Sequence, residues 1–299
     1  MYPKLPYHGK KTETKSVPVT FPEQHQKDQP GLEHLMEPRP ISENPDYKGS
    51  GKLRDKVAII TGGDSGIGRA VSYAFAKEGA DLVIVYFNEH QDAEETKKRV
   101  EELGRRCLLI PGDLKEEAFS SELVDQTMKA FGKIDILVNN AAMQRPQKSL
   151  LDISAIQLEE TFRTNVFSYF YLTKAALPFL YEGTSIINTA SVTAYAGNKT
   201  LVDYSSTKGA IVTFTRSLAL QLAEQGIRVN GVAPGPIWTP LIPATFTGDQ
   251  VTEFGNNTPM KRPGQPFELA PTYVYLASDD SRYVSGQILH VNGGEITGL

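Results

Sequence analysis

From Lys56 onward, short runs of apolar residues alternate with longer segments in which apolar residues recur every three or four positions. Uninterrupted apolar runs are typical of strands buried on both faces, and the longer period is typical of amphipathic helices. The strands predicted on this basis are Val57–Thr61, Leu82–Phe87, Cys107–Ile110, Ile134–Asn139, Ser185–Thr189, Arg228–Ala233 and Ile288–Val291. The predicted helices are Ile67–Glu78, Asp92–Leu103, Glu116–Phe131, Ala155–Leu180, Tyr204–Glu224 and Phe267–Leu276.

Strands that alternate with helices through short connections predict a parallel sheet covered by helices on both faces. Seven strands within residues 51–299 suit one domain. The predicted fold is therefore a single α/β domain built on a doubly wound, seven-stranded parallel sheet, the Rossmann fold.

Residues 1–50 interrupt this pattern, because they hold eight of the 19 prolines. Proline excludes long helices and pairs poorly in a sheet, so we expect an extended N-terminal arm. The arm also carries apolar residues, mostly in its second half: Phe21, Leu32, Leu35, Met36, Ile41 and Tyr47. We expect it to lie ordered on the catalytic domain or on a neighbouring subunit from about Pro30, with the first twenty residues mobile. Its expected contribution is to oligomer stability rather than to chemistry.

A second proline-rich segment, residues 234–266, follows a predicted strand at its carboxyl end. Long loops in compact domains are usually functional or disordered, so we expect a lid that contains a short helix. Trp238, Leu241, Phe246 and Met260 are candidates for its apolar walls. The alternative is a surface excursion without a role in substrate binding.

The composition narrows the class of protein. Hydrophobic residues make up 40% of the chain and charged residues 22%, with a net charge of −4. An ordinary globular protein without a basic surface is expected, not a nucleic-acid-binding protein. No run approaches the roughly 18 apolar residues of a membrane helix, and the first ten residues lack the apolar core of a signal peptide. The single cysteine, Cys107, lies in an apolar run and is expected to be a buried thiol, so we expect a cytoplasmic protein.

The segment from Thr61 to Gly68 reads TGGDSGIG and lies between a predicted strand and a predicted helix. Glycines allow the backbone to approach phosphates closely, and the helix N-terminus offers free N–H groups and the positive end of its dipole. This order predicts a pyrophosphate site. The alternative is an ordinary glycine-rich turn.

Two Tyr-x-x-x-Lys pairs lie on predicted helices, Tyr204 with Lys208 and Tyr73 with Lys77. Residues four apart share one helix face, and an ammonium group lowers the pKa of a neighbouring phenol. The first pair follows a strand that ends at Ser191, where ligands bind in doubly wound sheets, so we expect it to be the functional pair. For Tyr73 and Lys77 we expect packing and a solvated face.

Together with Asn139–Ala142, Asn165 and Pro234–Gly235, these motifs resemble the short-chain dehydrogenase/reductase family of the single-domain type. The resemblance covers roughly residues 51–299, and one departure is Ala142, where the family usually has glycine. It implies an NAD(P)-dependent oxidoreductase that transfers a hydride between a nicotinamide and an alcohol, aldehyde, ketone or sugar. The alternatives are a non-catalytic dinucleotide-binding regulator and a stress-associated assembly protein with the same fold.

The resemblance also implies roles for individual residues. Tyr204 is the expected general acid and base, Lys208 lowers the pKa of Tyr204 and binds the ribose, Ser191 holds the substrate oxygen, and Asn165 anchors a water that feeds protons to Lys208. The implied cofactor-binding residues are Gly62, Asp64, Ser65, Gly66, Ile67, Gly68, Tyr86, Asn88, Asp113, Leu114, Asn140, Ala141, Ala142, Tyr204, Lys208, Pro234, Gly235, Ile237 and Thr239. The family further implies a homotetramer.

The choice between NAD and NADP is not encoded in the usual way. An acid after the second strand normally selects NAD and a basic residue selects NADP, but Tyr86 and Phe87 stand at these places. Asp64 would repel a phosphate, so the charge favours NAD slightly.

The five histidines are isolated from other metal-binding side chains, and no metal site is expected.

Overall fold

The seven strands form one parallel sheet in the order β3-β2-β1-β4-β5-β6-β7, in a computed structural model that describes residues 17–297. The strands are β1 (Val57–Thr61), β2 (Asp81–Tyr86), β3 (Cys107–Pro111), β4 (Ile136–Asn139), β5 (Ser185–Thr189), β6 (Arg228–Pro234) and β7 (Ile288–Val291). In the register, Ile59 of β1 lies beside Val83 on one side and Leu137 on the other. The chain leaves β1 in one direction and returns on its other side at β4, so a crevice opens at the carboxyl ends of these two strands.

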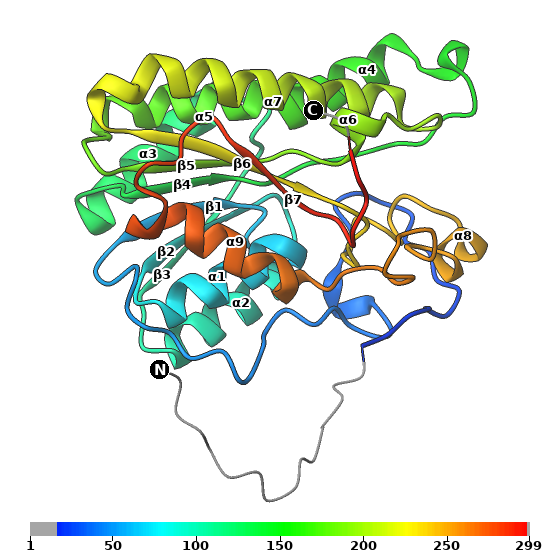
Figure 1. Cartoon of the computed structure of the whole chain (residues 1–299), viewed down its shortest axis with the longest axis horizontal. Helices are drawn as coiled ribbons and strands as arrows, with labels where there is room; N and C mark the ends of the chain where they lie inside the picture. Colours follow the sequence, from blue (N-terminus) through cyan, green and yellow to red (C-terminus); the bar gives the residue numbers. More distant parts are fainter. Residues whose placement is uncertain (1–16, 298–299) are drawn as a thin grey trace, which may run out of the picture.

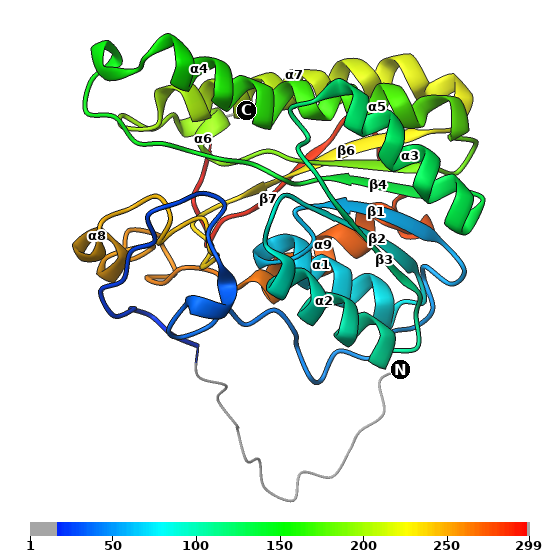
Figure 2. The ribbon, with the colours of Figure 1, turned by 180° about the vertical axis from the view of Figure 1, so that it is seen from behind.

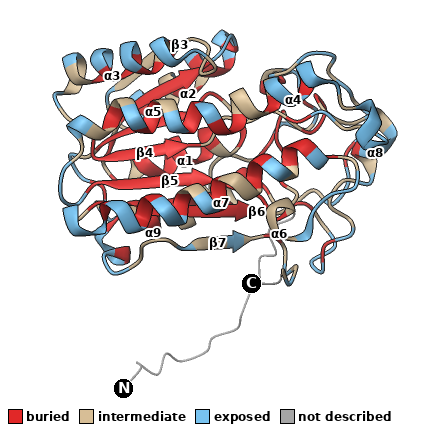
Figure 3. Ribbon diagram, turned by 90° about the horizontal axis from the view of Figure 1, so that it is seen from above, coloured by how far each residue is buried: buried red, intermediate tan, exposed pale blue. Residues whose placement is uncertain are grey.

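Helices cover both faces of the sheet, as the alternation predicts (Figures 1 and 2). One layer contains α1 (Gly66–Lys77), α2 (His90–Glu102) and α9 (Pro266–Ala277). The other contains α3 (Glu117–Phe131), α4 (Ala155–Phe162), α5 (Ser168–Ala176) and α7 (Val202–Leu222). The central strands are buried on both faces and the helices expose their outer sides (Figure 3). This burial explains why the strands are continuous apolar runs in the sequence.

The predicted helix Ala155–Leu180 is not one regular helix. It comprises α4, a π-helical turn η3 (Arg163–Phe167), α5 and a 3-10 turn η4 (Leu177–Phe179). A π turn inserts one extra residue per turn, which redirects the side chains that follow, and such turns occur frequently at functional sites. The side chain of Asn165 lies inside η3 and is fully buried. The apolar period alone does not reveal this insertion.

Residues 17–50 run along the lower helix layer and the segment between β6 and α9 (Figure 1). Contact begins earlier than the expected Pro30, because Phe21 is buried and stacks on Trp238 with ring centroids 3.6 Å apart. The expected mobility of the first twenty residues concerns mainly residues 1–16, which lie outside the described residues. Within residues 17–50 the regular structure is one 3-10 turn, η1 (Glu33–Leu35).

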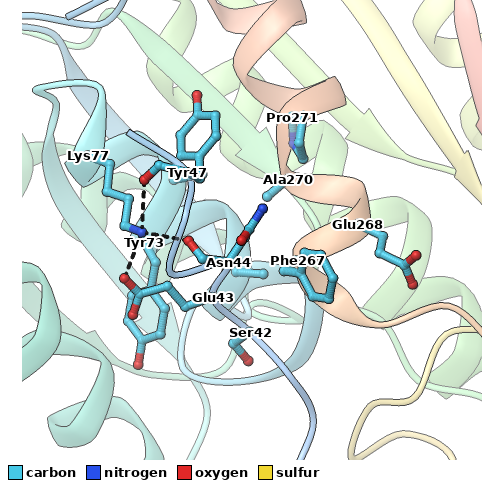
Figure 4. A pocket seen from close by; sticks show the side chains of 12 residues that line it. Ser42, Glu43, Asn44, Tyr47, Tyr73, Lys77, Phe267, Glu268, Ala270 and Pro271 are labelled. Atoms are coloured by element: carbon cyan, nitrogen blue, oxygen red, sulfur yellow. Dashed lines mark hydrogen bonds and ion pairs between the residues drawn. The ribbon is translucent and has the colours of Figure 1, made fainter. Parts of the chain in front are cut away.

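The Tyr73–Lys77 pair lies beneath the arm, and the expected solvated face is wrong for Lys77. The Nζ atom of Lys77 donates to the carbonyl oxygens of Asn44 and Tyr47, at 2.9 and 3.2 Å, and forms an ion pair with Glu43 at 2.8 Å. These groups surround a small cavity of about 120 Å³ between the arm, α1 and α9 (Figure 4). The arm thus covers this face of α1. The sequence pattern around Tyr73 and Lys77 could not predict this contact, because the arm residues are distant in the sequence.

The segment between β6 and α9 contains the expected short helix, α8 (Gly248–Thr252). Two of the four residues expected to form apolar walls do not line the large cavity at the carboxyl ends of the strands. Trp238 is fully buried under Phe21, and Met260 is exposed. Leu241 and Phe246 do line that cavity.

Within residues 17–297, no helix combines the length and the apolar character needed to cross a bilayer.

Candidate functional site: a dinucleotide cleft with a Ser-Tyr-Lys group

A cavity of about 650 Å³ opens at the carboxyl ends of the strands. Its walls come from the glycine-rich turn after β1, the loop after β4, the end of β5, α7 and the segment between β6 and α9. This is the crevice where ligands bind in doubly wound sheets. The side chains that the sequence places at strand ends therefore meet here.

The glycine-rich turn needs its glycines for two separate reasons. Gly62 and Gly66 have φ angles of +62° and +51°, in the left-handed region that side chains disfavour. A Cβ on Gly68 would lie 1.9 Å from the carbonyl oxygen of Gly62, so Gly68 permits α1 to approach the turn. The first N–H groups of α1 consequently lie at this turn, where that of Gly66 donates to Glu33 and the next ones have no partner within the helix.

Thr61 joins the two strands that flank the cleft. Its Oγ1 accepts hydrogen bonds from the backbone N–H groups of Asn140 and Ala141, at 2.8 and 3.0 Å. The side chain of Asn140 in turn donates to the carbonyl oxygen of Thr61 at 3.0 Å. These bonds hold the loop after β4 against the glycine-rich turn, which fixes the width of the cleft.

Ser191 and Tyr204 both line the cavity, close enough for the serine hydroxyl to act on the pKa of the phenol. Ser191 follows β5, and its Oγ accepts from the N–H of Thr193 at 3.2 Å, which orients the hydroxyl. Tyr204 comes from the first turn of α7 and is 8% exposed. Burial raises the pKa of Tyr204 to about 12, and the hydrogen bond with Ser191 acts in the opposite direction. The phenol is therefore protonated at neutral pH.

Lys208 lies one turn further along α7 and is 1% exposed. Its Nζ donates to the carbonyl oxygen of Thr189 at 2.8 Å and lies 5.5 Å from the centre of the Tyr204 ring. Burial lowers the pKa of Lys208 to about 7. The expected lowering of the tyrosine pKa by the lysine charge is thus wrong, because burial dominates at both groups.

Asn165 lies behind the cavity wall and not in it. Its Nδ2 donates to the carbonyl oxygen of Met143 at 2.9 Å, and its Oδ1 accepts from the N–H of Met143 at 2.8 Å. The same Nδ2 also reaches Oγ1 of Thr207 at 3.1 Å. Asn165 thereby joins η3, the loop after β4 and the residue that precedes Lys208.

Most of the predicted cofactor-binding positions line this one cavity. The lining includes Gly62, Asp64, Ser65, Gly66, Ile67, Tyr86, Asp113, Leu114, Asn140, Ala141, Ala142, Tyr204, Lys208, Pro234, Gly235, Ile237 and Thr239. Gly68 and Asn88 do not line it. Gly68 is the packing contact described above, and the N–H of Asn88 donates to Glu89 at 2.8 Å.

Glu89 is a cavity residue that the sequence reasoning missed. Its Oε2 also accepts from the N–H of Phe87 at 3.0 Å, so the side chain folds back over the end of β2. Asp64 faces the same part of the cavity, and its Oδ2 is buried without a hydrogen-bond partner among the described residues. Burial and the neighbouring charge of Glu89 raise the pKa of Asp64 to about 8. An acid beyond the strand end was the available signal, but Glu89 lies three positions after Tyr86, the position usually inspected.

Three arm residues, Gln29, Pro30 and Gly31, also line the cavity. This contact was not expected for an arm that serves assembly alone. The local sequence gives no signal for it, because the partners of Gln29 are more than 100 residues away.

Cys107 lies outside this cavity. It is half-buried, and burial raises the pKa of its thiol to about 12, which makes it a poor nucleophile.

The cleft fits an extended dinucleotide. Free helix amides lie at the glycine-rich turn, an orphaned acid lies near the end of β2, and Ser191, Tyr204 and Lys208 lie beyond β5. A bound nicotinamide dinucleotide would supply the hydride chemistry. Residues of the turn are suited to hold its phosphates, and Lys208 is suited to bind ribose hydroxyls. The protein's own groups then orient the substrate and move the proton.

Comparisons with known proteins agree with this arrangement. Residues 62–295 match a family model described as enoyl-(acyl carrier protein) reductase. The uncharacterized oxidoreductase YhxC of Bacillus subtilis is 66% identical over 93% of this chain and 96% of its own. A glucose and ribitol dehydrogenase homolog of rice is 55% identical, over 92% of this chain and 97% of its own. The NADPH-dependent aldehyde reductase 1 of Arabidopsis thaliana is also 55% identical, over 91% of this chain and 97% of its own.

Among solved structures, a short chain dehydrogenase from Burkholderia cenocepacia in complex with NADP superposes with a TM-score of 0.76 at 30% identity. The superposition covers 81% of this chain and 98% of the other. The fold, the cleft and these likenesses lead to one conclusion: this chain belongs to the short-chain dehydrogenase/reductase family and is an NAD(P)-dependent oxidoreductase.

Proposed function

We propose that the protein reduces the carbonyl group of small aldehydes, ketones or sugars, and oxidises the corresponding alcohols, with Tyr204 as the general acid and base. The observation that carries this proposal is the convergence of Ser191, Tyr204 and Lys208 on one end of the cavity. Relatives named for glucose and ribitol, and for aldehydes, support this substrate class.

The protonation states favour carbonyl reduction as the direction ready at neutral pH. Tyr204 carries its proton, so it can donate to a carbonyl oxygen as negative charge develops there. Ser191 is oriented by Thr193 and can donate to the same oxygen. Lys208, when charged, would stabilise the phenolate that remains. Asn165 acts on these groups indirectly, through Met143 and Thr207.

For the cofactor we propose a preference for NAD over NADP. The support is the pair Asp64 and Glu89, since carboxyl groups suit ribose hydroxyls as hydrogen-bond partners and offer no positive charge to a 2′-phosphate. Dissociation constants for NADH and NADPH, from the quenching of protein fluorescence, test this preference. Glu89→Gln should narrow the difference between the two cofactors. Equal or tighter binding of NADPH by the unmodified protein would refute the assignment.

We further propose a homotetramer in the cytoplasm. Apolar side chains that are exposed on η3, α5 and α7 support the assembly, among them Phe167, Phe170 and Leu220. Light scattering at micromolar concentration measures the mass, and a monomer would contradict the proposal. The single unpaired cysteine suits a reducing compartment, and fractionation of cells tests the location.

The central experiment measures cofactor consumption with NADH and with NADPH across aldehydes, ketones and sugars. Turnover that disappears in Tyr204→Phe supports the proposed chemistry. Tight cofactor binding without turnover of any substrate would favour a dinucleotide-binding regulator instead.

A further inference from the structure

We propose that Gln29 and Glu33, both from the N-terminal arm, are positioning residues of the oxidoreductase site. Glu33 fixes the glycine-rich turn, and Gln29 sets the lid against the loop after β4. The arm is then a structural part of the site, in addition to any role in assembly.

Glu33 acts on the turn as a helix cap supplied from outside the helix. It is 1% exposed, and its Oε2 accepts a hydrogen bond from the N–H of Gly66 at 2.6 Å. The first N–H groups of any helix have no partner within the helix. With the N–H of Gly66 occupied by Glu33, that of Ile67, which also lines the cavity, is left to bind a ligand anion. The arm thus decides which amides of α1 face the cleft.

Arg69 extends this hold to the beginning of the turn. Its Nη1 pairs with Oε1 of Glu33 at 2.7 Å, and its Nε donates to the carbonyl oxygen of Asp64 at 2.8 Å. The turn from Asp64 to Gly66 is therefore clamped at both ends by one buried ion pair. Arg69 also offsets the negative charge of Glu33, which would otherwise repel a pyrophosphate beside it.

The surroundings of this ion pair are mostly acidic. Asp92 and Glu95 lie 3.3 and 3.4 Å from the guanidinium of Arg69, and Arg39 of the arm forms an ion pair with Glu95. The carboxylate of Asp92 accepts from the N–H groups of Glu33 and His34, at 2.8 and 3.0 Å. Helix α2 thus holds the backbone of the arm in place at the point where Glu33 enters the site.

Gln29 joins two walls of the cavity through one carboxamide. Its Nε2 donates to the carbonyl oxygens of Gln144 and Ala244, at 2.6 and 3.2 Å. Its Oε1 accepts from the N–H of Gln144 at 3.2 Å. Gln144 belongs to the loop after β4, and Ala244 belongs to the lid. All three bonds are to backbone atoms, so Gln29 fixes the separation of the two walls.

The rest of the arm keeps the lid in place from behind. Nε1 of Trp238 donates to the carbonyl oxygen of Pro38 at 2.9 Å, and the N–H of Gln26 donates to that of Pro243 at 2.8 Å. A Cβ on Gly31 would lie 2.3 Å from the carbonyl oxygen of Pro240, so the two backbones are in direct contact. The lid is consequently a supported wall, and arm residues determine its position.

The test uses the full-length protein and three alanine variants, Glu33→Ala, Gln29→Ala and Glu43→Ala. Glu43→Ala is the matched control. Glu43 lies on the same arm and forms ion pairs with Lys77 of α1 and Arg99 of α2, but it does not line the main cavity. The dissociation constant of NADH is measured by fluorescence, KM and kcat with one carbonyl substrate, and the melting temperature by calorimetry.

We expect Glu33→Ala to weaken NADH binding about tenfold, the size of one lost charge-assisted hydrogen bond. Glu33→Gln, which keeps an acceptor for Gly66, should recover most of that affinity. Gln29→Ala should raise KM for the carbonyl substrate several-fold with little change in NADH affinity. Glu43→Ala should lower the melting temperature and leave both constants within twofold.

Two results would overturn the proposal. One is unchanged NADH affinity in Glu33→Ala together with unchanged KM in Gln29→Ala. The other is an equal loss of NADH affinity in Glu43→Ala, which would mean that detachment of the arm, and not the position of these two side chains, causes the effect.

Discussion

The two Tyr-x-x-x-Lys pairs share a spacing and a helical setting but differ in what surrounds each lysine. Lys208 contacts one carbonyl oxygen and lies beside the rings of Tyr169 and Tyr204. Lys77 is held by a carboxylate and two carbonyl oxygens from the arm. An ammonium with a carboxylate partner is stable as a structural cation, whereas one buried without a counter-charge is poised to lose its proton. The motif therefore acquires a function only through its partners.

The sharpest test of this comparison exchanges each tyrosine for phenylalanine. Tyr204→Phe should lower kcat by about 10³-fold, because the missing hydroxyl carries the proton while the ring volume is preserved. Tyr73→Phe should remain within about twofold of the unmodified enzyme. Steady-state rates at saturating cofactor measure both. Our assignment fails if Tyr73→Phe is the inactive variant.

The pH dependence of stability separates the two lysines next. The folded-state pKa of Lys208 is about 7, below its ordinary value, so the unfolded chain binds the extra proton between these two values. The cost of burying Lys208 is thus complete below pH 7 and declines as the pH rises above 7. Lys208→Met should raise the free energy of unfolding at pH 6 by on the order of 3 kcal/mol and flatten its rise toward pH 9. Denaturant titrations at several pH values check this; an unaltered slope would argue against a neutral buried lysine.

Cofactor affinity gives a smaller difference. Lys208→Ala should weaken NADH binding about tenfold, since one or two hydrogen bonds to ribose hydroxyls are lost. Lys77→Ala should leave the dissociation constant unchanged, because its contacts are with the arm. Fluorescence titration of both variants decides the point, and equal constants for Lys208→Ala and the unmodified protein would remove the ribose-binding role.

The smallest expected effect concerns the structural lysine. Lys77→Met should lower the free energy of unfolding by about 1 kcal/mol, because Glu43 keeps Arg99 as a partner while two arm carbonyl groups lose theirs. Urea denaturation at pH 7 measures this loss. If the variant is as stable as the unmodified protein, the contacts of Lys77 with the arm contribute nothing to the free energy of unfolding.

Local pattern sufficed for much of the architecture. The strand runs and the turn from Thr61 to Gly68 identified the sheet and its crevice, because buried parallel strands carry their own apolar signature. Ser191, Tyr204 and Lys208 could be placed in that crevice since all three lie at or beyond the end of one strand. These inferences needed only neighbours in the sequence.

Contacts between distant segments were beyond the sequence. The side chains of Gln29 and Trp238 donate to the backbone carbonyl groups of Ala244 and Pro38. Every residue possesses such a carbonyl group, so no sequence pattern identifies these partners. The direction of the Tyr204 pKa also depends on how completely α7 buries the ring, and periodicity does not report this. Glu89 escaped because its side chain folds back along the chain.

The distance in sequence between the arm and its partners also bears on biosynthesis. Ribosomes synthesise about 5 to 20 residues per second, so Pro38 leaves the ribosome roughly 10 to 40 s before Trp238 does. During that interval the arm has no lid to bind, and its aromatic and apolar side chains stay open to chaperones and to other nascent chains. The arm is therefore made well before its partners but is among the last segments to find its place, and the mature cleft is assembled only after the segment that follows β6 has emerged.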